Sequence, residues 1–190
     1  MILADGMGSG SQAHADAALT VTLLKGFLEA GRSPRSALEE TGRIIREQTG
    51  GERPAAADLL ILKADGRFLL LKAGGAPSYL IAPDGLKQMR SACPPLGAPV
   101  EHLPTSFSGR LKEWETVLLC SDGFVPPAPL LLETARLPRS QWRSRLEAAS
   151  DPAADDFSSA VCGPAPTPSG PERKSGGRVA ISEKDGIIPQ

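Results

Sequence analysis

Apolar residues recur at helical spacing near the start of the chain. Four of them are separated by four, three and four positions: Ala17, Val21, Leu24 and Leu28. This spacing predicts a helix with one buried face that begins near Ser9 or Ser11 and ends at Gly31. The Ser-Pro pair at 33–34 is a favourable N-cap and first-turn combination, which predicts a second helix that continues to about Gly50.

Beyond residue 55 the apolar residues form short runs that are typical of strands. The predicted strands cover residues 57–63, 67–73, 78–82, 86–90 and 115–120. Asp-Gly pairs at 65–66 and 84–85 lie between consecutive runs, and an Asp-Gly pair in that position indicates a β-hairpin. The stretch 91–109 holds several Pro and Gly residues and is predicted to be a long connection, and a short helix is expected around 141–149. Helices followed by an antiparallel meander indicate the α+β class.

Composition narrows the class of protein further. With 190 residues and 41% apolar residues, the chain can bury the core of one domain. Aromatic residues make up only 4%, so the core must consist of aliphatic side chains. From Gly163 onward Pro, Gly, Ser and charged residues dominate, which predicts a folded domain over 1–162 and a disordered tail over 163–190. The net charge of −1 offers no electrostatic case for nucleic acid or for an anionic membrane.

Cysteine usage and hydropathy indicate a cytoplasmic protein. Cys93, Cys120 and Cys162 are odd in number, far apart and without CxxC spacing, so they are predicted to be reduced thiols. No stretch of the sequence approaches the ~20 apolar residues that a membrane-spanning helix needs.

Acidic residues follow three apolar runs at positions suited to chemistry. Asp5 opens a glycine-rich turn, Asp122 lies in a Ser-Asp-Gly turn, and Asp155 begins an Asp-Asp pair. Carboxylates at strand ends, beside glycines that allow backbone carbonyls to come close, provide the oxygen ligands that a hard divalent cation needs. His14 and His102 have no evident serine or cysteine partner, so no activated side-chain nucleophile competes with a metal-assisted hydrolysis.

Taken in this order, the three acidic turns resemble the metal-dependent protein phosphatases of the PP2C class, and especially the bacterial SpoIIE-like serine phosphatases. The segment beginning at Asp5 and Gly6 resembles the DGMG motif of that class, whose aspartate bridges two metal ions and whose glycine offers a carbonyl oxygen. By the same resemblance Asp122 and Asp155 are the remaining ligands of the first metal, which is Mn²⁺ or Mg²⁺. The resemblance extends over residues 1–162 and includes the segments 72–79 and 94–97.

The resemblance implies a fold and a function. The fold is a PP2C-like sandwich of two antiparallel β-sheets flanked by α-helices. The activity is hydrolysis of phosphoserine or phosphothreonine on a protein by a metal-activated water, with a phosphorylated STAS-type anti-anti-sigma factor as the expected partner. Members of this class normally have two strands and a further acidic ligand before the DGMG motif. Only four residues precede Asp5, so the resemblance predicts an N-terminally incomplete sandwich with a weakened second metal site.

Two alternatives stay open at this point. The stretch 8–13 fits the G-x-G-x-x-A pattern of dinucleotide binding, but a Rossmann unit requires a strand where a second helix is predicted. The other alternative is a catalytically inactive PP2C-like binding module, or a fragment that needs a partner segment to complete its sheets. The Asp-Gly pairs beginning at Asp65, Asp84 and Asp185 are predicted to be plain turns.

Overall fold

The computed structural model describes residues 1–99, 103–150 and 158–164. Its strands are β1 (Ile2–Gly6), β2 (Ala55–Leu62), β3 (Arg67–Ala73), β4 (Ser78–Ala82), β5 (Gly85–Met89), β6 (Thr105–Arg110), β7 (Thr116–Cys120) and β8 (Ser159–Cys162). Its helices are α1 (Ser11–Glu29), α2 (Pro34–Thr49), α3 (Ala128–Thr134), the 3₁₀ turn η1 (Arg139–Gln141) and α4 (Trp142–Glu147).

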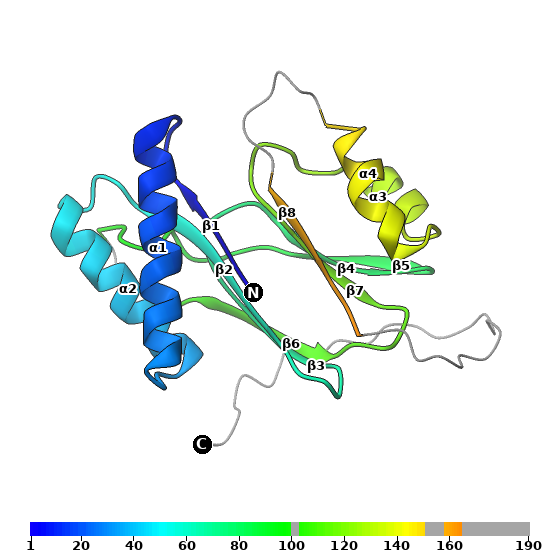
Figure 1. Ribbon diagram of the computed structural model, residues 1–190, viewed down its shortest axis with the longest axis horizontal. Coiled ribbons are helices and arrows are strands. Elements are labelled where there is room, and N and C mark those ends of the chain that lie inside the picture. The colour runs from blue at the N-terminus through cyan, green and yellow to red at the C-terminus, as the bar shows by residue number, and fades with distance from the viewer. Residues whose placement is uncertain (100–102, 151–157, 165–190) are drawn as a thin grey trace.

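The strands form two antiparallel sheets that pack face to face. One sheet has the order β1-β2-β3-β6 and the other the order β5-β4-β7-β8. Helices α1 and α2 lie against the first sheet, and α3 and α4 lie on the far side of the second (Figure 1). The predicted sandwich of two antiparallel sheets with flanking helices is therefore confirmed.

Period-two alternation along the strands assigns each side chain to one of the resulting layers. On β2 and β3, Leu59 and Leu71 face the helices, whereas Leu60 and Leu70 face the second sheet. The layer between the sheets contains a cluster of buried residues: Leu60, Phe68, Leu70, Leu80, Met89, Leu111, Val117 and Leu119. A third cluster joins the outer face of the second sheet to α3 and α4. Most of these residues are aliphatic, as the low aromatic content predicts.

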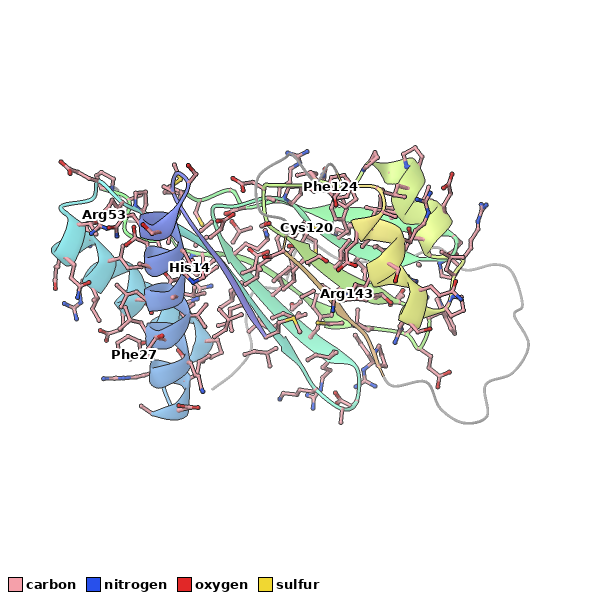
Figure 2. All side chains as sticks on the ribbon, turned by 45° about the horizontal axis from the view of Figure 1, so that its top comes forward. His14, Phe27, Arg53, Cys120, Phe124 and Arg143 are labelled. Carbon is pink, nitrogen blue, oxygen red and sulfur yellow. The ribbon has the colours of Figure 1, made fainter. Side chains whose placement is uncertain are left out.

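The first two helices begin and end where the sequence predicts. The hydroxyl of Ser33 accepts a hydrogen bond from the amide of Ser36 at 3.2 Å, and Pro34 occupies the first turn of α2. Gly50 ends α2 in the left-handed region, with φ of 63°. Arg53 follows α2 (Figure 2) and forms an ion pair with Asp16 of α1 at 3.1 Å, so the segment leading into β2 is fastened to α1.

Two elements differ from the prediction. The supposed connection 91–109 contains most of β6, which pairs with β3 at the edge of the first sheet. Helix α3, over Ala128–Thr134, has no counterpart in the sequence prediction. Among the helices that the structure describes, none combines the length and apolar character needed to cross a membrane. The predicted tail lies almost wholly outside the described residues.

Candidate metal centre

Strand β1 carries Asp5 to the junction with α1, and the junction requires glycine. A Cβ on Gly6 would lie 2.2 Å from the carbonyl oxygen of Ala13, inside van der Waals contact with the first turn of α1. Gly8 and Gly10 have φ angles of 90° and 83°, which side chains other than glycine rarely adopt. The glycines of this turn therefore allow α1 to begin directly against the end of the strand that carries Asp5.

The second acidic turn lies at the end of β7, in the opposite sheet. Ser121 is buried, and its amide donates to the carbonyl oxygen of Ser158 at 2.9 Å. The amide of Ser158 donates in return to the hydroxyl of Ser121 at 2.9 Å. These two bonds fix the end of β7 beside the start of β8. Asp122, the next residue, is exposed to solvent.

The two turns meet at one small depression at an end of the sandwich. Asp5 of the first sheet and Ser121 of the second both line it. Most of the other lining residues are small: Ala4, Ala56, Ala57, Gly75 and Ala76. A carboxylate from one sheet and the acidic turn of the other are thus brought to the same place, with little side-chain bulk around them.

The predicted ligands are only partly assembled in the described residues. Asp5 and Gly6 lie at the depression or directly beside it, and Asp122 follows a residue that lines it. Asp155 lies outside the described residues. Within residues 1–99, 103–150 and 158–164, no three His, Cys, Asp or Glu side chains form a group that could hold a metal ion. The donors that are present, two carboxylates and a backbone carbonyl, are oxygen ligands and match the chemistry of Mn²⁺ or Mg²⁺.

Asp65, in the Asp-Gly pair between β2 and β3, has a structural role in a turn. Asp65 accepts hydrogen bonds from the amide of Arg67 at 3.1 Å and from its guanidinium at 2.6 Å. The backbone amide of Arg67, together with its side chain, lowers the pKa of Asp65. The carboxylate is engaged in closing the β2–β3 hairpin, as the sequence predicts. His14 lies on α1 (Figure 2) and belongs to no metal-ligating group of the described residues.

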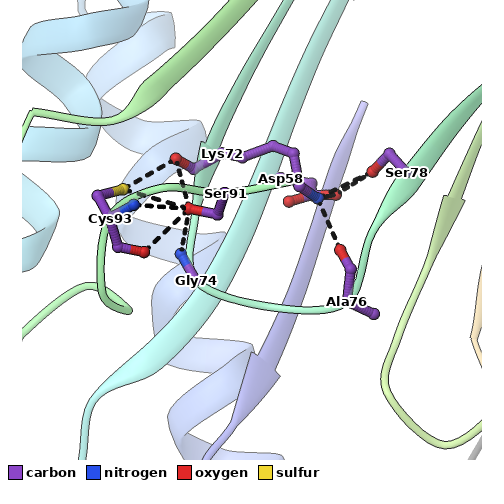
Figure 3. A network of polar contacts seen from close by, with 7 residues as sticks. All are labelled: Asp58, Lys72, Gly74, Ala76, Ser78, Ser91 and Cys93. Carbon is purple, nitrogen blue, oxygen red and sulfur yellow. Dashed lines mark hydrogen bonds and ion pairs between the residues drawn. The ribbon is translucent and has the colours of Figure 1, made fainter. Parts of the chain in front are cut away.

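A buried polar network adjoins the depression, and the sequence prediction did not include it. Lys72 of β3 is fully buried, and its ammonium donates to the carboxylate of Asp58. It also donates to the carbonyl oxygen of Ala76 and to the hydroxyl of Ser78, both at 2.9 Å (Figure 3). The hydroxyl of Ser78 donates to the same carboxylate at 2.7 Å. Asp58, with Ala76, also lines the depression.

Burial works against the charges of this network. It raises the pKa of the Asp58 carboxyl, and the neighbouring Lys72 ammonium counteracts the rise. It lowers the pKa of the Lys72 ammonium, which Asp58 counteracts in turn. An ammonium has three N–H donors, and here each has an oxygen acceptor, so the geometry fits a charged lysine paired with a carboxylate.

A signal in the sequence identifies this pair. The β2–β3 hairpin places Leu62 opposite Phe68, and the same register places Asp58 directly opposite Lys72. Opposite charges that interrupt two apolar runs at facing positions indicate a cross-strand pair.

The fold is similar to that of solved PP2C-class phosphatase domains. The PP2C phosphatase domain of SpoIIE from Bacillus subtilis, solved with a fragment of its regulatory domain, is similar with a TM-score of 0.71 at 24% identity, over 84% of this chain and 52% of that one. The catalytic domain of the serine/threonine phosphatase PstP, solved in complex with two manganese ions, is similar with a TM-score of 0.64 at 18% identity, over 84% and 85%. The fold is that of the PP2C class.

Sequence comparison identifies the family within that class. The family model for stage II sporulation protein E (SpoIIE) matches residues 1–162. The stage II sporulation protein E of Bacillus subtilis (strain 168) is 30% identical over 122 residues, which is 64% of this chain and 15% of that protein. The chain therefore belongs to the SpoIIE family, and it matches only a small part of the length of this relative.

Proposed function

We propose that this chain is a metal-dependent protein serine/threonine phosphatase domain over residues 1–162. Its metal ions are Mn²⁺ or Mg²⁺, and their ligands are the carboxylates of Asp5, Asp122 and Asp155 and the carbonyl oxygen of Gly6. The observation that carries this proposal is the meeting of Asp5 and Ser121, from opposite sheets, at one depression. Asp155 precedes Ser158 by three residues in the sequence, and Ser158 is hydrogen-bonded to Ser121 beside Asp122.

The lining of the depression favours attack by water rather than by a side chain. Cys120 is the only cysteine among its lining residues, and burial raises the pKa of its thiol to about 12. A thiol with such a pKa holds its proton at neutral pH and is a poor nucleophile. Ser121 uses its hydroxyl to accept a hydrogen bond from Ser158. A bound pair of divalent ions would supply an acidified water and would neutralise charge on the transferring phosphoryl group.

The proposed substrate is a phosphoserine on a STAS-type anti-anti-sigma factor in the cytoplasm. Membership of the SpoIIE family supports this choice of substrate. The side chains around Asp5 are mostly small, which suits a phosphate carried on a protein segment that itself stays outside the depression.

Phosphate release from a phosphoserine peptide tests the function. The chain should release phosphate with Mn²⁺ and not in excess chelator, and acid quenching should trap no phosphoenzyme. Asp5→Ala, Asp122→Ala and Asp155→Ala should each lower turnover by at least about a hundredfold, because fewer carboxylates hold the cation. Asp65→Ala and Asp84→Ala, at hairpin turns, are the matched controls and should keep most of the wild-type turnover.

Two results would contradict this proposal. Sustained turnover in chelator would exclude the metal-assisted mechanism. A folded chain without turnover in Mn²⁺ or Mg²⁺ would favour the catalytically inactive binding module instead.

A further inference from the structure

One wall of the depression is a loop that passes from the first sheet to the second. It joins β3 to β4, and it contributes Gly75 and Ala76 to the lining around Asp5. Gly74 and Gly75 have φ angles of 65° and 77°, in the region that favours glycine. Because glycine adopts many backbone conformations, two glycines in succession do not fix the path of the loop, and contacts with other residues are needed to fix it.

The inner side of this loop is held by the buried lysine. Of the three acceptors around the Lys72 ammonium, the Ala76 carbonyl belongs to the loop and the Ser78 hydroxyl to the first residue of β4. The Asp58 carboxylate on the neighbouring strand balances the charge of the ammonium. A single side chain thus joins β2, β3, the loop and β4 directly behind the wall of the depression (Figure 3).

The start of the same loop is fastened on the other side. The amide of Gly74 donates to the carbonyl oxygen of Cys93 at 3.1 Å and to the hydroxyl of Ser91 at 3.0 Å. A Cβ on Gly74 would lie 2.6 Å from the ring of Pro95, so the backbone packs closely against that segment. The segment around Ser91 holds the beginning of the loop, and Lys72 holds its end.

We propose that Lys72 is a positioning residue, which clamps the Gly75–Ala76 backbone as the wall against which the protein chain flanking the phosphoserine docks. This inference rests on the proposed phosphatase function. The depression is small, and alanine and glycine make up half of its lining residues, so it does not enclose a polypeptide. The residues on either side of a phosphoserine must therefore cross its rim. A buried lysine that satisfies each of its donors and holds a rim carbonyl fixes the shape of that surface.

The decisive variant replaces the charge pair by apolar residues of similar size. Lys72→Met alone would leave Asp58 buried without its counter-charge. The chain could then misfold, and the effect of misfolding could not be separated from loss of the clamp. The double variant Asp58→Leu with Lys72→Met removes both charges, a change that buried ion pairs often tolerate. Ser78→Ala is the matched control, because it removes a hydroxyl of the network and leaves the bond from Lys72 to Ala76.

Backbone order in the full chain tests the clamp without reference to catalysis. In ¹⁵N relaxation the wild-type amides of Gly75 and Ala76 should have order parameters of about 0.85, which should fall below about 0.6 in the double variant. Ser78→Ala should stay close to wild type. An unchanged loop in a folded double variant would overturn the clamp.

Substrate choice tests what the clamp does. The ratio of kcat/KM for a phosphoserine peptide to that for p-nitrophenyl phosphate should fall about tenfold in the double variant, mainly through KM for the peptide. A parallel loss on both substrates would overturn the docking role, since a general structural defect acts on both. A wild-type chain that hydrolyses neither substrate would refute the phosphatase function, while the relaxation experiment would still decide the clamp.

Discussion

The space between the two sheets differs sharply from one end to the other. On four strands, the side chain that faces the other sheet is apolar at one position and polar two residues away, toward the depression. These pairs are Leu60 and Asp58, Leu70 and Lys72, Leu80 and Ser78, and Leu119 and Ser121. The apolar end stabilises the sandwich by removing hydrocarbon from water. The polar end borders the depression with Asp5, and it costs stability because charges are desolvated there. One continuous layer thus contains a region that holds the sheets together and a region that shapes the site.

The largest expected change in stability comes from breaking the charge pair at the polar end. Lys72→Met should lower the free energy of unfolding by about 3–5 kcal/mol, because it leaves Asp58 buried alone. Adding Asp58→Leu should restore most of the lost stability. Because burial raises the pKa of Asp58 and the single variant lacks the Lys72 ammonium that counteracts the rise, the folded variant binds a proton more readily than the unfolded chain does. The defect of the single variant should therefore shrink as the pH falls toward about 4. Urea denaturation at several pH values measures both effects, and a single variant as stable as the double would contradict the charge-pair account.

A comparable loss is expected at the apolar end, with a different consequence for the site. Leu70→Ala should cost about 2–5 kcal/mol, because it removes a fully buried side chain and leaves a cavity between the sheets. Affinity for Mn²⁺ should change by less than about threefold below the unfolding temperature, since the altered position is remote from the ligands. Calorimetric unfolding with a parallel Mn²⁺ titration provides both values. Loss of the metal from a folded Leu70→Ala chain would show that the two ends are not separable.

The β1–α1 junction should be sensitive to a single methyl group. Gly6→Ala should cost about 1–3 kcal/mol and weaken Mn²⁺ binding about tenfold, because the new Cβ collides with the carbonyl of Ala13 and displaces the end of β1. Gly26→Ala is the matched control. A Cβ there meets nothing within 4 Å, and alanine favours the helix by about 1 kcal/mol. Equal metal affinities in the two variants would contradict the close approach at Gly6.

A smaller effect is expected from Cys120 at alkaline pH. Burial raises the pKa of this thiol in the folded protein to about 12, whereas the pKa of an unfolded cysteine is about 8.5. The unfolded state alone therefore loses the proton above about pH 8.5. Between this pH and the pKa of the folded protein, the free energy of unfolding therefore falls as the pH rises, by up to about 1.4 kcal/mol per pH unit. Comparing the pH dependence of unfolding in wild type and Cys120→Ala isolates this contribution, and identical slopes would contradict a protected thiol.

The sequence predicts those elements that carry a strong local signal. Helices α1 and α2 follow from apolar spacing and from the cap at Ser33, and two hairpins follow from Asp-Gly pairs. Strand β6 escapes prediction because Phe107 is its only large apolar residue and it pairs on one side only. Helix α3 escapes because seven residues are too few for a periodic pattern and Pro129 resembles a loop residue, although proline is tolerated in a first turn.

The candidate site divides in a similar way. Asp5 and Asp122 are recognisable because glycines beside them mark tight turns after apolar runs. The meeting of Asp5 with Ser121 cannot be read from local patterns, because it depends on how two sheets pack. The pair of Asp58 and Lys72 can be read only after the register of the β2–β3 hairpin is applied. Long-range packing, rather than residue type, limits what the sequence reveals.

The central claim is that the acidic turns of the two sheets form one metal site, and Mn²⁺ binding measured by calorimetry tests it most directly. Wild type, Asp5→Ala and Asp122→Ala should be compared with the hairpin variants Asp65→Ala and Asp84→Ala, with circular dichroism as the check on folding. The first two variants should weaken Mn²⁺ binding by at least about tenfold and the hairpin variants by less than about twofold. Equal losses in both pairs, or no loss in either, would contradict the account.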